Sequence, residues 1–337
     1  MNLVTGGTGL LGSHIVEQLC KRGQPVRALA RASSDTSWLA SQDVEIFTGD
    51  LADPDALGRA CEGVTCVYHA AARVGDWGPW PEFQKYTIDG TRHLIDAAIA
   101  AGVRRFIHVS SVSAYGHGND HGRILDENDP LGKDLYRWAY YSRAKVAAEE
   151  IVWRAQREGK IAVTVIRPAW IYGIRDRKTI ERQVAAIRNG KVKIIGDGKN
   201  RLNVVNAASV AMGAILAAEN DQAIGEAYNC SEDGTLTLQQ YYDAIADALG
   251  EPRPTKHIPY GLAYALAFLL ECWGHLIHKK TPPLVTRYSV WLMGRQCFFS
   301  ADKARRELGW QPAVSYEEGI PMTVQWYLEQ ERNRRAT

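Results

Sequence analysis

Apolar residues in the first half of the chain form short continuous runs separated by longer amphipathic stretches. Short runs of this kind are typical of strands buried on both faces of a parallel sheet. The stretches between them have helical spacing, as in Leu94, Ile95 and Ala98. Alternating strands and helices predict an α/β fold with a doubly wound parallel sheet. The strands are expected at residues 3–4, 26–30, 44–51, 66–72, 105–109 and 161–166.

The rest of the chain is predicted to add a smaller C-terminal substrate-binding lobe to this sheet. We assign residues 1–168 together with 202–222 to the sheet domain, a Rossmann fold. The lobe then comprises residues 169–201 and 223–330. Other expected features are strands at 202–205 and 227–230, a polar loop at 116–134 and a charged tail at 330–337.

A glycine-rich turn lies between the first strand and the first helix. Gly6, Gly9 and Gly12 recur at every third position, and Leu10 and Leu11 begin the helical stretch. Glycines allow a tight turn and close approach of the backbone to a ligand, and a helix N-terminus offers free N–H donors. The turn therefore predicts a binding site for the phosphates of a dinucleotide.

The ends of the second and third strands suggest how the adenosine half of a dinucleotide is bound. In this fold a carboxylate after the second strand binds the ribose of NAD, whereas arginine accommodates the 2′-phosphate of NADP. Arg31 stands there, which favours NADP; alternatively, Arg31 stacks on adenine and NAD binds too. Asp50 and Leu51 end the third strand and are expected beside adenine, although Asp50 could instead cap the next helix.

The fourth strand leads into a region that could approach cofactor and substrate. The tryptophan-containing loop at residues 74–83 could cover a ligand, or it could be a surface loop anchored by Trp77 and Trp80. Small side chains at the end of the strand would let the backbone pass close to a cofactor, and these residues are Ala70, Ala71 and Ala72.

Tyr141 and Lys145 are four residues apart in a strongly helical stretch, so they project from one helix face. A nearby ammonium group lowers the pKa of a phenol from its free value of about 10, as acid/base catalysis near neutral pH requires. The pair follows a strand that ends in Ser110 and Ser111. Together with the glycine turn, this pattern predicts a tyrosine acid/base acting beside a nucleotide.

Composition and charge narrow the possible classes. The net charge of +2 does not imply a nucleic-acid partner. The six cysteines form no C-x-x-C pair, so we expect reduced thiols and no metal site. Because the glycine turn begins at residue 6, no leader or anchor is expected before it, and a cytoplasmic location is predicted.

Two further segments each have two interpretations. Residues 175–201 are rich in Lys and Arg, which indicates either a solvated basic face or an anion site that begins at Arg175. Residues 261–277 are strongly apolar but shorter than the roughly 20 residues that a membrane span needs. They are expected to form a helix of the lobe or a peripheral membrane contact.

These motifs occur in an order that resembles the extended short-chain dehydrogenase/reductase family over nearly the whole chain. They read T-G-G-T-G-L-L-G, G-D-L, H-A-A-A, V-S-S-V-S-A-Y-G, Y-x-x-x-K and R-P-A-x-I-Y-G. The resemblance implies that Ser111, Tyr141 and Lys145 are catalytic. It also implies a homodimer formed through helices that include the one carrying Tyr141. The implied cofactor contacts are Gly6, Gly9, Leu10, Leu11, Gly12, Asp50, Leu51, Ala70, Ala71, Ala72, Tyr141, Lys145, Pro168 and Ile171.

The C-terminal third is similar to the 3β-hydroxysteroid dehydrogenase branch, which includes sterol-4α-carboxylate 3-dehydrogenases and 2-alkyl-3-oxoalkanoate reductases. The similarity rests on residues 286–290, 299–304 and 307–312. Trp170 departs from the related sugar-nucleotide epimerases, which have an asparagine there that binds the substrate diphosphate. A tryptophan favours a flat apolar ligand, so Trp170, with Trp77 and Ser113, is expected to contact substrate.

The predicted function is NAD(P)-dependent interconversion of a secondary alcohol and a ketone on a lipophilic substrate, either sterol-like or a 2-alkyl-3-oxoalkanoate. The main alternative is a sugar-nucleotide epimerase or dehydratase, which Trp170 disfavours and the basic segment favours. A third possibility is a redox-sensing binding protein of the same fold, which the Tyr141–Lys145 pair disfavours because such proteins usually lack it. A fourth is a scaffold, which would not convert the cofactor with any alcohol.

Overall fold

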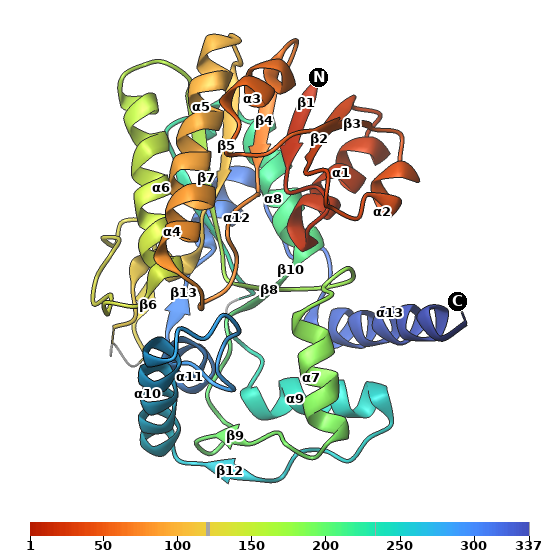
Figure 1. Cartoon of the computed structure of the whole chain (residues 1–337), viewed down its shortest axis with the longest axis vertical. Helices are drawn as coiled ribbons and strands as arrows, with labels where there is room; N and C mark the ends of the chain where they lie inside the picture. Colours follow the sequence, from red (N-terminus) through yellow and green to blue (C-terminus); the bar gives the residue numbers. More distant parts are fainter. Residues whose placement is uncertain (119–121, 233, 337) are drawn as a thin grey trace.

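A central sheet of seven parallel strands carries helices on both faces (Figure 1). The computed structural model describes residues 1–118, 122–232 and 234–336 of the chain. The strand order is β11-β7-β5-β4-β1-β2-β3, which confirms the predicted doubly wound α/β fold. The strands are β1 (Asn2–Thr5), β2 (Val26–Ala30), β3 (Glu45–Thr48), β4 (Cys66–His69), β5 (Arg105–Val109), β7 (Ala162–Pro168) and β11 (Ala227–Cys230).

Alternate side chains of each strand enter two separate cores, as the continuous apolar runs require. Val4 and Ile107 pack under one helix layer, whereas their neighbours Leu3 and Phe106 pack under the other. The first layer consists of α1 (Leu10–Lys21), α8 (Ala207–Glu219) and α12 (Asp302–Leu308), and the second of α3 (Pro54–Cys61), α5 (Gly90–Ala100) and α6 (Tyr140–Arg157).

The strand order reverses on either side of β1, which pairs with β2 on one side and with β4 on the other. Ligands of open α/β sheets bind at the carboxyl ends of the strands at such a switch point. The glycine turn follows β1 directly and therefore lies at this edge.

The domain boundary predicted at residue 223 needs a correction. Strand β11 falls in the range assigned to the lobe, but it pairs with β7 and completes the edge of the central sheet. All four of its residues are buried, and α12 packs against it. In contrast, β10 (Val204–Asn206) leaves the central sheet and pairs with β8 (Trp170–Tyr172).

The lobe lies beyond the carboxyl ends of the strands and has its own apolar core (Figure 1). Val184, Ile245 and Val324 come from three different helices and are almost fully buried there. The helices of the lobe are α7 (Thr179–Arg188), α9 (Leu238–Leu249), α10 (Tyr260–Leu276), α11 (Arg287–Gly294) and α13 (Tyr316–Ala336), and its small parallel pair is β9 (Ile194–Ile195) with β12 (His257–Ile258).

The remaining elements are short. The loop expected at 74–83 becomes helical at Trp80, where α4 begins and runs without interruption into α5. Residues 119–121 of the predicted polar loop, and Thr337 of the predicted tail, lie outside the described residues. The short elements are α2 (Ser37–Ala40), α4 (Trp80–Phe83), a π-helix (Gln84–Asp89), 3₁₀ turns (Val112–Tyr115 and Asp221–Ala223), β6 (Ile124–Leu125) and β13 (Phe298–Phe299).

Within residues 1–118, 122–232 and 234–336, no helix is both long and apolar enough to cross a membrane. Four of the six cysteines, which all lie in the described part, are buried.

Candidate active site

Tyr141, Lys145 and Ser111 meet where the start of α6 crosses the carboxyl end of β5. The Lys145 Nζ atom lies 5.9 Å from the centre of the Tyr141 ring. Lys145 is only 4% exposed, and its ammonium donates a hydrogen bond of 2.7 Å to the Val109 carbonyl oxygen, the last of β5. This bond ties the helix that carries both side chains to the strand that leads to Ser111.

The polar partner of the Tyr141 phenol is Ser111, not Lys145. Burial raises the pKa of Tyr141, and a side-chain hydrogen bond with Ser111 opposes the rise. The expectation that Lys145 lowers this pKa is wrong for the structure as it stands, because the ammonium is directed to the Val109 carbonyl. Burial in turn lowers the pKa of Lys145 to about 8, although the nearby Glu149 carboxylate raises it. Lys145 thus changes charge close to physiological pH.

The glycine turn is packed so tightly that side chains would not fit. Gly6 has φ +74°, and a Cβ there would lie 2.9 Å from the Ala71 nitrogen. A Cβ on Gly12 would collide with the Gly6 carbonyl oxygen. Helix α1 begins after Gly9 without a side-chain cap, so the N–H groups of its first turn have no acceptor within the helix. This cradle fits an anion that is held by backbone donors.

Three predicted adenosine contacts lie at the ends of β2 and β3. Arg31 is exposed directly after β2, and Leu51 is buried. The nearest carboxylate to Arg31 in sequence is Asp35, and it already binds Arg177 Nη1 at 2.6 Å. Asp50 accepts a hydrogen bond from the Ala52 nitrogen, but Asp53 caps α3, so the capping role considered for Asp50 is wrong.

The loop that precedes α4 is anchored by its two tryptophans. The Trp77 ring lies 4.5 Å from that of His275, and its indole N–H donates to the Lys279 carbonyl oxygen at 2.8 Å. Trp80 lies under the Arg143 guanidinium. Of the two interpretations, these contacts favour the anchored loop. The contacts of Trp77 with α10 do not support its predicted role toward substrate.

The other predicted substrate and cofactor contacts follow β7. Pro168 ends β7, and Ile171 lies in the middle of β8. The half-buried Trp170 ring packs 5.2 Å from Tyr241, against the core of the lobe. Trp170 therefore lines the junction of the lobe and the sheet domain, and its contact with substrate stays a prediction.

Arg175 does not serve the anion site considered for residues 175–201, because its guanidinium already binds α1; for the rest of that segment the anion site stays a prediction. The guanidinium donates to Ser13 and His14, both at 2.9 Å, and pairs with Glu17 at 2.5 Å. Burial, and then the Arg175 charge, lower the pKa of His14 to about 4, so that its ring is neutral and accepts this bond. Arg175 thus fastens the segment after β8 to the first helix.

Two features of the site were missed from the sequence. Behind α6, the Glu149 carboxylate binds Arg167 Nη2 at 2.5 Å, and Arg167 Nη1 donates to the Tyr115 hydroxyl at 2.8 Å. A charged residue inside the apolar β7 run was the available signal for this network. The second feature is Tyr288, whose pKa is raised by burial and by nearby Tyr141. The available signal was its place in residues 286–290, one of the stretches similar to the sterol dehydrogenase branch. That stretch did not connect it to Tyr141, from which 146 residues separate it.

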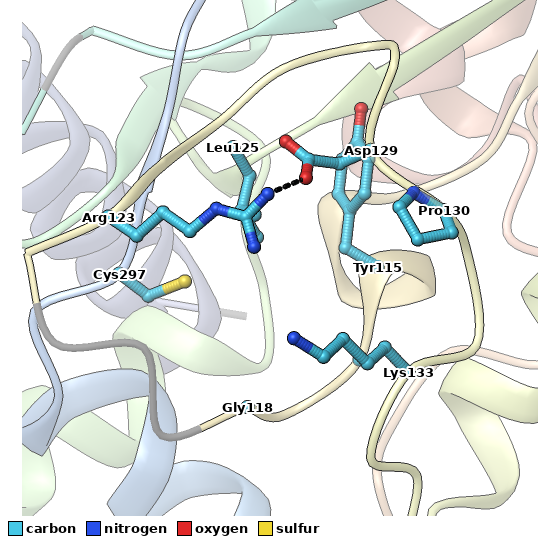
Figure 2. A pocket seen from close by; sticks show the side chains of 9 residues that line it. Tyr115, Gly118, Arg123, Leu125, Asp129, Pro130, Lys133 and Cys297 are labelled. Carbon is cyan, nitrogen blue, oxygen red and sulfur yellow. Dashed lines mark hydrogen bonds and ion pairs between the residues drawn. The ribbon is translucent and has the colours of Figure 1, made fainter.

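The Ser113 side chain opposes the rise in the pKa of Tyr288, which puts Ser113 beside this second tyrosine. A cavity of about 270 Å³ lies beside Tyr115 (Figure 2). Neither Ser111 nor Tyr141 lines this cavity. Arg123 and Asp129 form an ion pair in the wall of the cavity. Its lining residues are Tyr115, Gly116, Gly118, Arg123, Leu125, Asp129, Pro130, Lys133 and Cys297.

Residues 2–231 match the sequence signature of the NAD dependent epimerase/dehydratase family. The chain belongs to this family. It is 32% identical over 325 residues to the 2-alkyl-3-oxoalkanoate reductase of Stenotrophomonas maltophilia, a match that covers 94% of this chain and 96% of the relative. The decarboxylating sterol-4-alpha-carboxylate 3-dehydrogenase of Mus musculus is 32% identical over 330 residues, with 96% and 89% covered.

Solved structures share the fold of this chain. The crystal structure of gox2253 superposes with a TM-score of 0.82 at 31% identity and covers 98% of this chain and 99% of its own. The UDP-glucose 4-epimerase of Thermotoga maritima, at 23% identity and a TM-score of 0.77, shares the fold; 98% of this chain and 100% of that chain are covered. The resemblance to the extended dehydrogenase/reductase enzymes and their sterol dehydrogenase branch is confirmed. The protein is an enzyme of this NAD-dependent family, and its relatives include dehydrogenases and reductases.

Proposed function

We propose that this family member is an NAD(P)-dependent oxidoreductase that interconverts a 3-hydroxy and a 3-keto group on a lipophilic substrate. The observation that carries the proposal is the position of Tyr141 beside Ser111 and 5.9 Å from the ammonium of buried Lys145, which is bonded to the carboxyl end of β5. Relatives named as a 3-oxoalkanoate reductase and a sterol 3-dehydrogenase support this reaction class.

The residues have distinct roles in this proposal. A bound nicotinamide cofactor would supply or accept the hydride. The Tyr141 phenol donates its proton to the ketone oxygen during reduction and takes it back during oxidation. Ser111, beside the phenol, donates a second hydrogen bond to the same oxygen and stabilises the charge that develops there. Lys145 binds the ribose of the cofactor and keeps α6 fixed to β5.

The glycine turn would hold the pyrophosphate, because the backbone at Gly6 and Gly12 has no room for a side chain and lies at the N-terminus of α1. We further propose a preference for NADP. Arg31 is exposed at the end of β2, and Asp35, the nearest carboxylate in sequence, is bound to Arg177. An exposed arginine favours the 2′-phosphate, and a carboxylate occupied by another cation is a poor acceptor for a ribose hydroxyl.

A lipophilic substrate is preferred to a nucleotide sugar for two reasons. Trp170 offers an apolar ring at the position where the similar epimerases carry an asparagine that binds the diphosphate. Arg175, the first cation of the basic segment, is bound to Ser13 and Glu17 and does not offer its charge to a diphosphate.

The experiment is a panel of a 2-alkyl-3-oxoalkanoate, a 3-keto sterol and UDP-glucose, followed by NADPH and NADH absorbance and by product analysis. We expect NADPH-dependent reduction of one lipophilic ketone. Tyr141→Phe should reduce kcat/KM by about 10²–10⁴-fold. The matched control is Tyr140→Phe. Tyr140 is the residue before Tyr141, and its ring packs on Trp80. Conversion of UDP-glucose without net change in NADPH, or near-normal turnover by folded Tyr141→Phe, would refute the proposal.

A further inference from the structure

The outer face of α10 is apolar along its whole length. The helix lies at the outer edge of the lobe (Figure 1). Five large side chains, between 42% and 70% exposed, repeat at intervals of four and three residues and so form one stripe. They are Leu262, Leu266, Leu269, Trp273 and Leu276. No residue in the ranges 1–118, 122–232 and 234–336 covers this stripe, and exposed apolar surface of this extent is typical of an interaction site.

The opposite face holds α10 flat against the lobe. Ala263, Ala267 and Gly274 are buried there, together with Glu271. The Glu271 carboxylate binds Arg287 Nε at 2.6 Å, which ties α10 to α11. A partner would therefore contact α10 along its exposed apolar face, with the helix lying parallel to the partner's surface.

The exposed charged residues that flank the stripe in sequence are all positive. Lys256 precedes α10, and Lys279 and Lys280 follow it; all three are exposed. From residue 256 to residue 284 the only acidic residue is Glu271, which is buried. Ile277 and Leu284 extend the exposed apolar surface into the basic end.

We propose that α10 and residues 277–284 dock this protein on the surface of a membrane that contains anionic lipid. An amphipathic helix lying in the interface buries its apolar face among acyl chains, and flanking lysines bind anionic headgroups. The exposed Trp273 suits the boundary between these layers, because its ring is apolar and its N–H is polar.

A second copy of the chain fits this surface less well. A symmetric pair would place the same patch on both subunits. If two α10 helices packed antiparallel, Lys279 and Lys280 of one copy would approach Lys256 of the other, and a parallel pair would bring Lys279 and Lys280 of both copies together. Like charges repel in either arrangement, whereas an anionic surface attracts every one of them.

Docking would place a membrane near the candidate active site, because the ring of Tyr140, the neighbour of Tyr141, lies 6.4 Å from that of His275 on the same helix. Delivery of a lipophilic substrate by this route rests on the proposed function, but the docking itself does not. The test therefore measures binding to lipid and needs neither cofactor nor turnover.

The experiment is vesicle flotation of the full chain, with vesicles of phosphatidylcholine alone and of equal parts phosphatidylcholine and phosphatidylglycerol. We expect binding to the anionic vesicles that weakens as salt is raised. The double variant Leu269→Glu/Trp273→Glu should lower the partition coefficient by at least about tenfold, and Lys279→Glu/Lys280→Glu should remove the preference for anionic lipid. The matched control is Met322→Glu, an exposed apolar position on α13, which should bind as the unaltered chain does.

Circular dichroism and thermal melting establish that each variant is folded before it is tested. The proposal is overturned if the unaltered chain does not float with anionic vesicles, or if Leu269→Glu/Trp273→Glu floats equally well. Analytical ultracentrifugation gives the remaining outcome. A dimer that this double variant separates would show that a second copy covers the stripe, and would also overturn the lipid assignment.

Discussion

Replacing Glu149 by glutamine tests the buried network behind α6. Glu149 is fully buried, and its carboxylate accepts hydrogen bonds from Arg167 and from the Trp153 indole N–H at 3.0 Å. Arg167 is 5% exposed, so Glu149→Gln leaves its guanidinium in the interior with the neutral Tyr115 hydroxyl and an amide in place of the carboxylate. A buried charge that loses its counter-ion is strongly destabilising.

The expected loss is about 3–5 kcal/mol, the usual cost of removing one partner of a buried ion pair. Glutamine still offers an acceptor oxygen, which favours the lower end. Unfolding entropy of about 2.1 cal/mol/K per residue amounts to about 0.7 kcal/mol/K for 337 residues. The midpoint of thermal unfolding should therefore fall by about 4–7 °C.

The same substitution should alter the titration of Lys145. The Glu149 carboxylate raises the pKa of Lys145, which burial has lowered to about 8, so Glu149→Gln should lower this pKa further. The ammonium then loses its charge at a lower pH. If Lys145 binds the cofactor ribose, the KM for cofactor should begin to rise at a lower pH than in the unaltered enzyme.

Two measurements test these expectations. Circular dichroism follows thermal unfolding, and initial rates are measured across pH 6–10, about two pH units on each side of the Lys145 pKa. The matched control is Glu150→Gln, next in sequence but exposed and paired with exposed Arg157 at 2.6 Å. Such a pair contributes at most about 1 kcal/mol. A midpoint for Glu149→Gln equal to that of Glu150→Gln would refute the account of the network.

Three further substitutions examine the proposed contacts with cofactor and substrate. Arg31→Asp should reverse the preference from NADPH to NADH in titration calorimetry; tighter binding of NADH by the unaltered protein would contradict the role of Arg31. Gly12→Ala forces a Cβ against the Gly6 carbonyl oxygen, and should abolish detectable cofactor binding and cost about 1–3 kcal/mol of stability by denaturant unfolding. Trp170→Asn should raise KM for the lipophilic substrate with little change for the cofactor, and an unchanged KM would remove Trp170 from the pocket.

The sequence predicted those features of this protein that depend on residues close together along the chain. The turn from Gly6 to Gly12 is specific because a strand, a turn and a helix follow one another within a few residues. Tyr141 and Lys145 share a face because helical geometry alone places residues four apart together. The doubly wound sheet followed from the alternation of apolar runs and amphipathic stretches, which depends only on local periodicity.

The tertiary structure decided which distant residues meet. Strand β11 returns to the sheet after the chain has entered the lobe, and periodicity does not state which edge a strand joins. Composition counts the cations of the basic segment, but only the fold shows that Arg175 is bound to α1 and Arg177 to Asp35. The residues around Tyr141 likewise come together from separate elements, with Ser111 and Tyr288 both far from it in sequence.

Helix α10 shows the same division between what the sequence determined and what the packing decided. The sequence alone determined that residues 261–277 are apolar and helical and too short to span a membrane. Only the packing decided that Ala263, Ala267 and Gly274 face the lobe while Leu269 and Trp273 face outward. The physical reason is that a nearly uniform apolar helix has no pattern of its own to choose its buried face, so contacts with the rest of the fold make that choice.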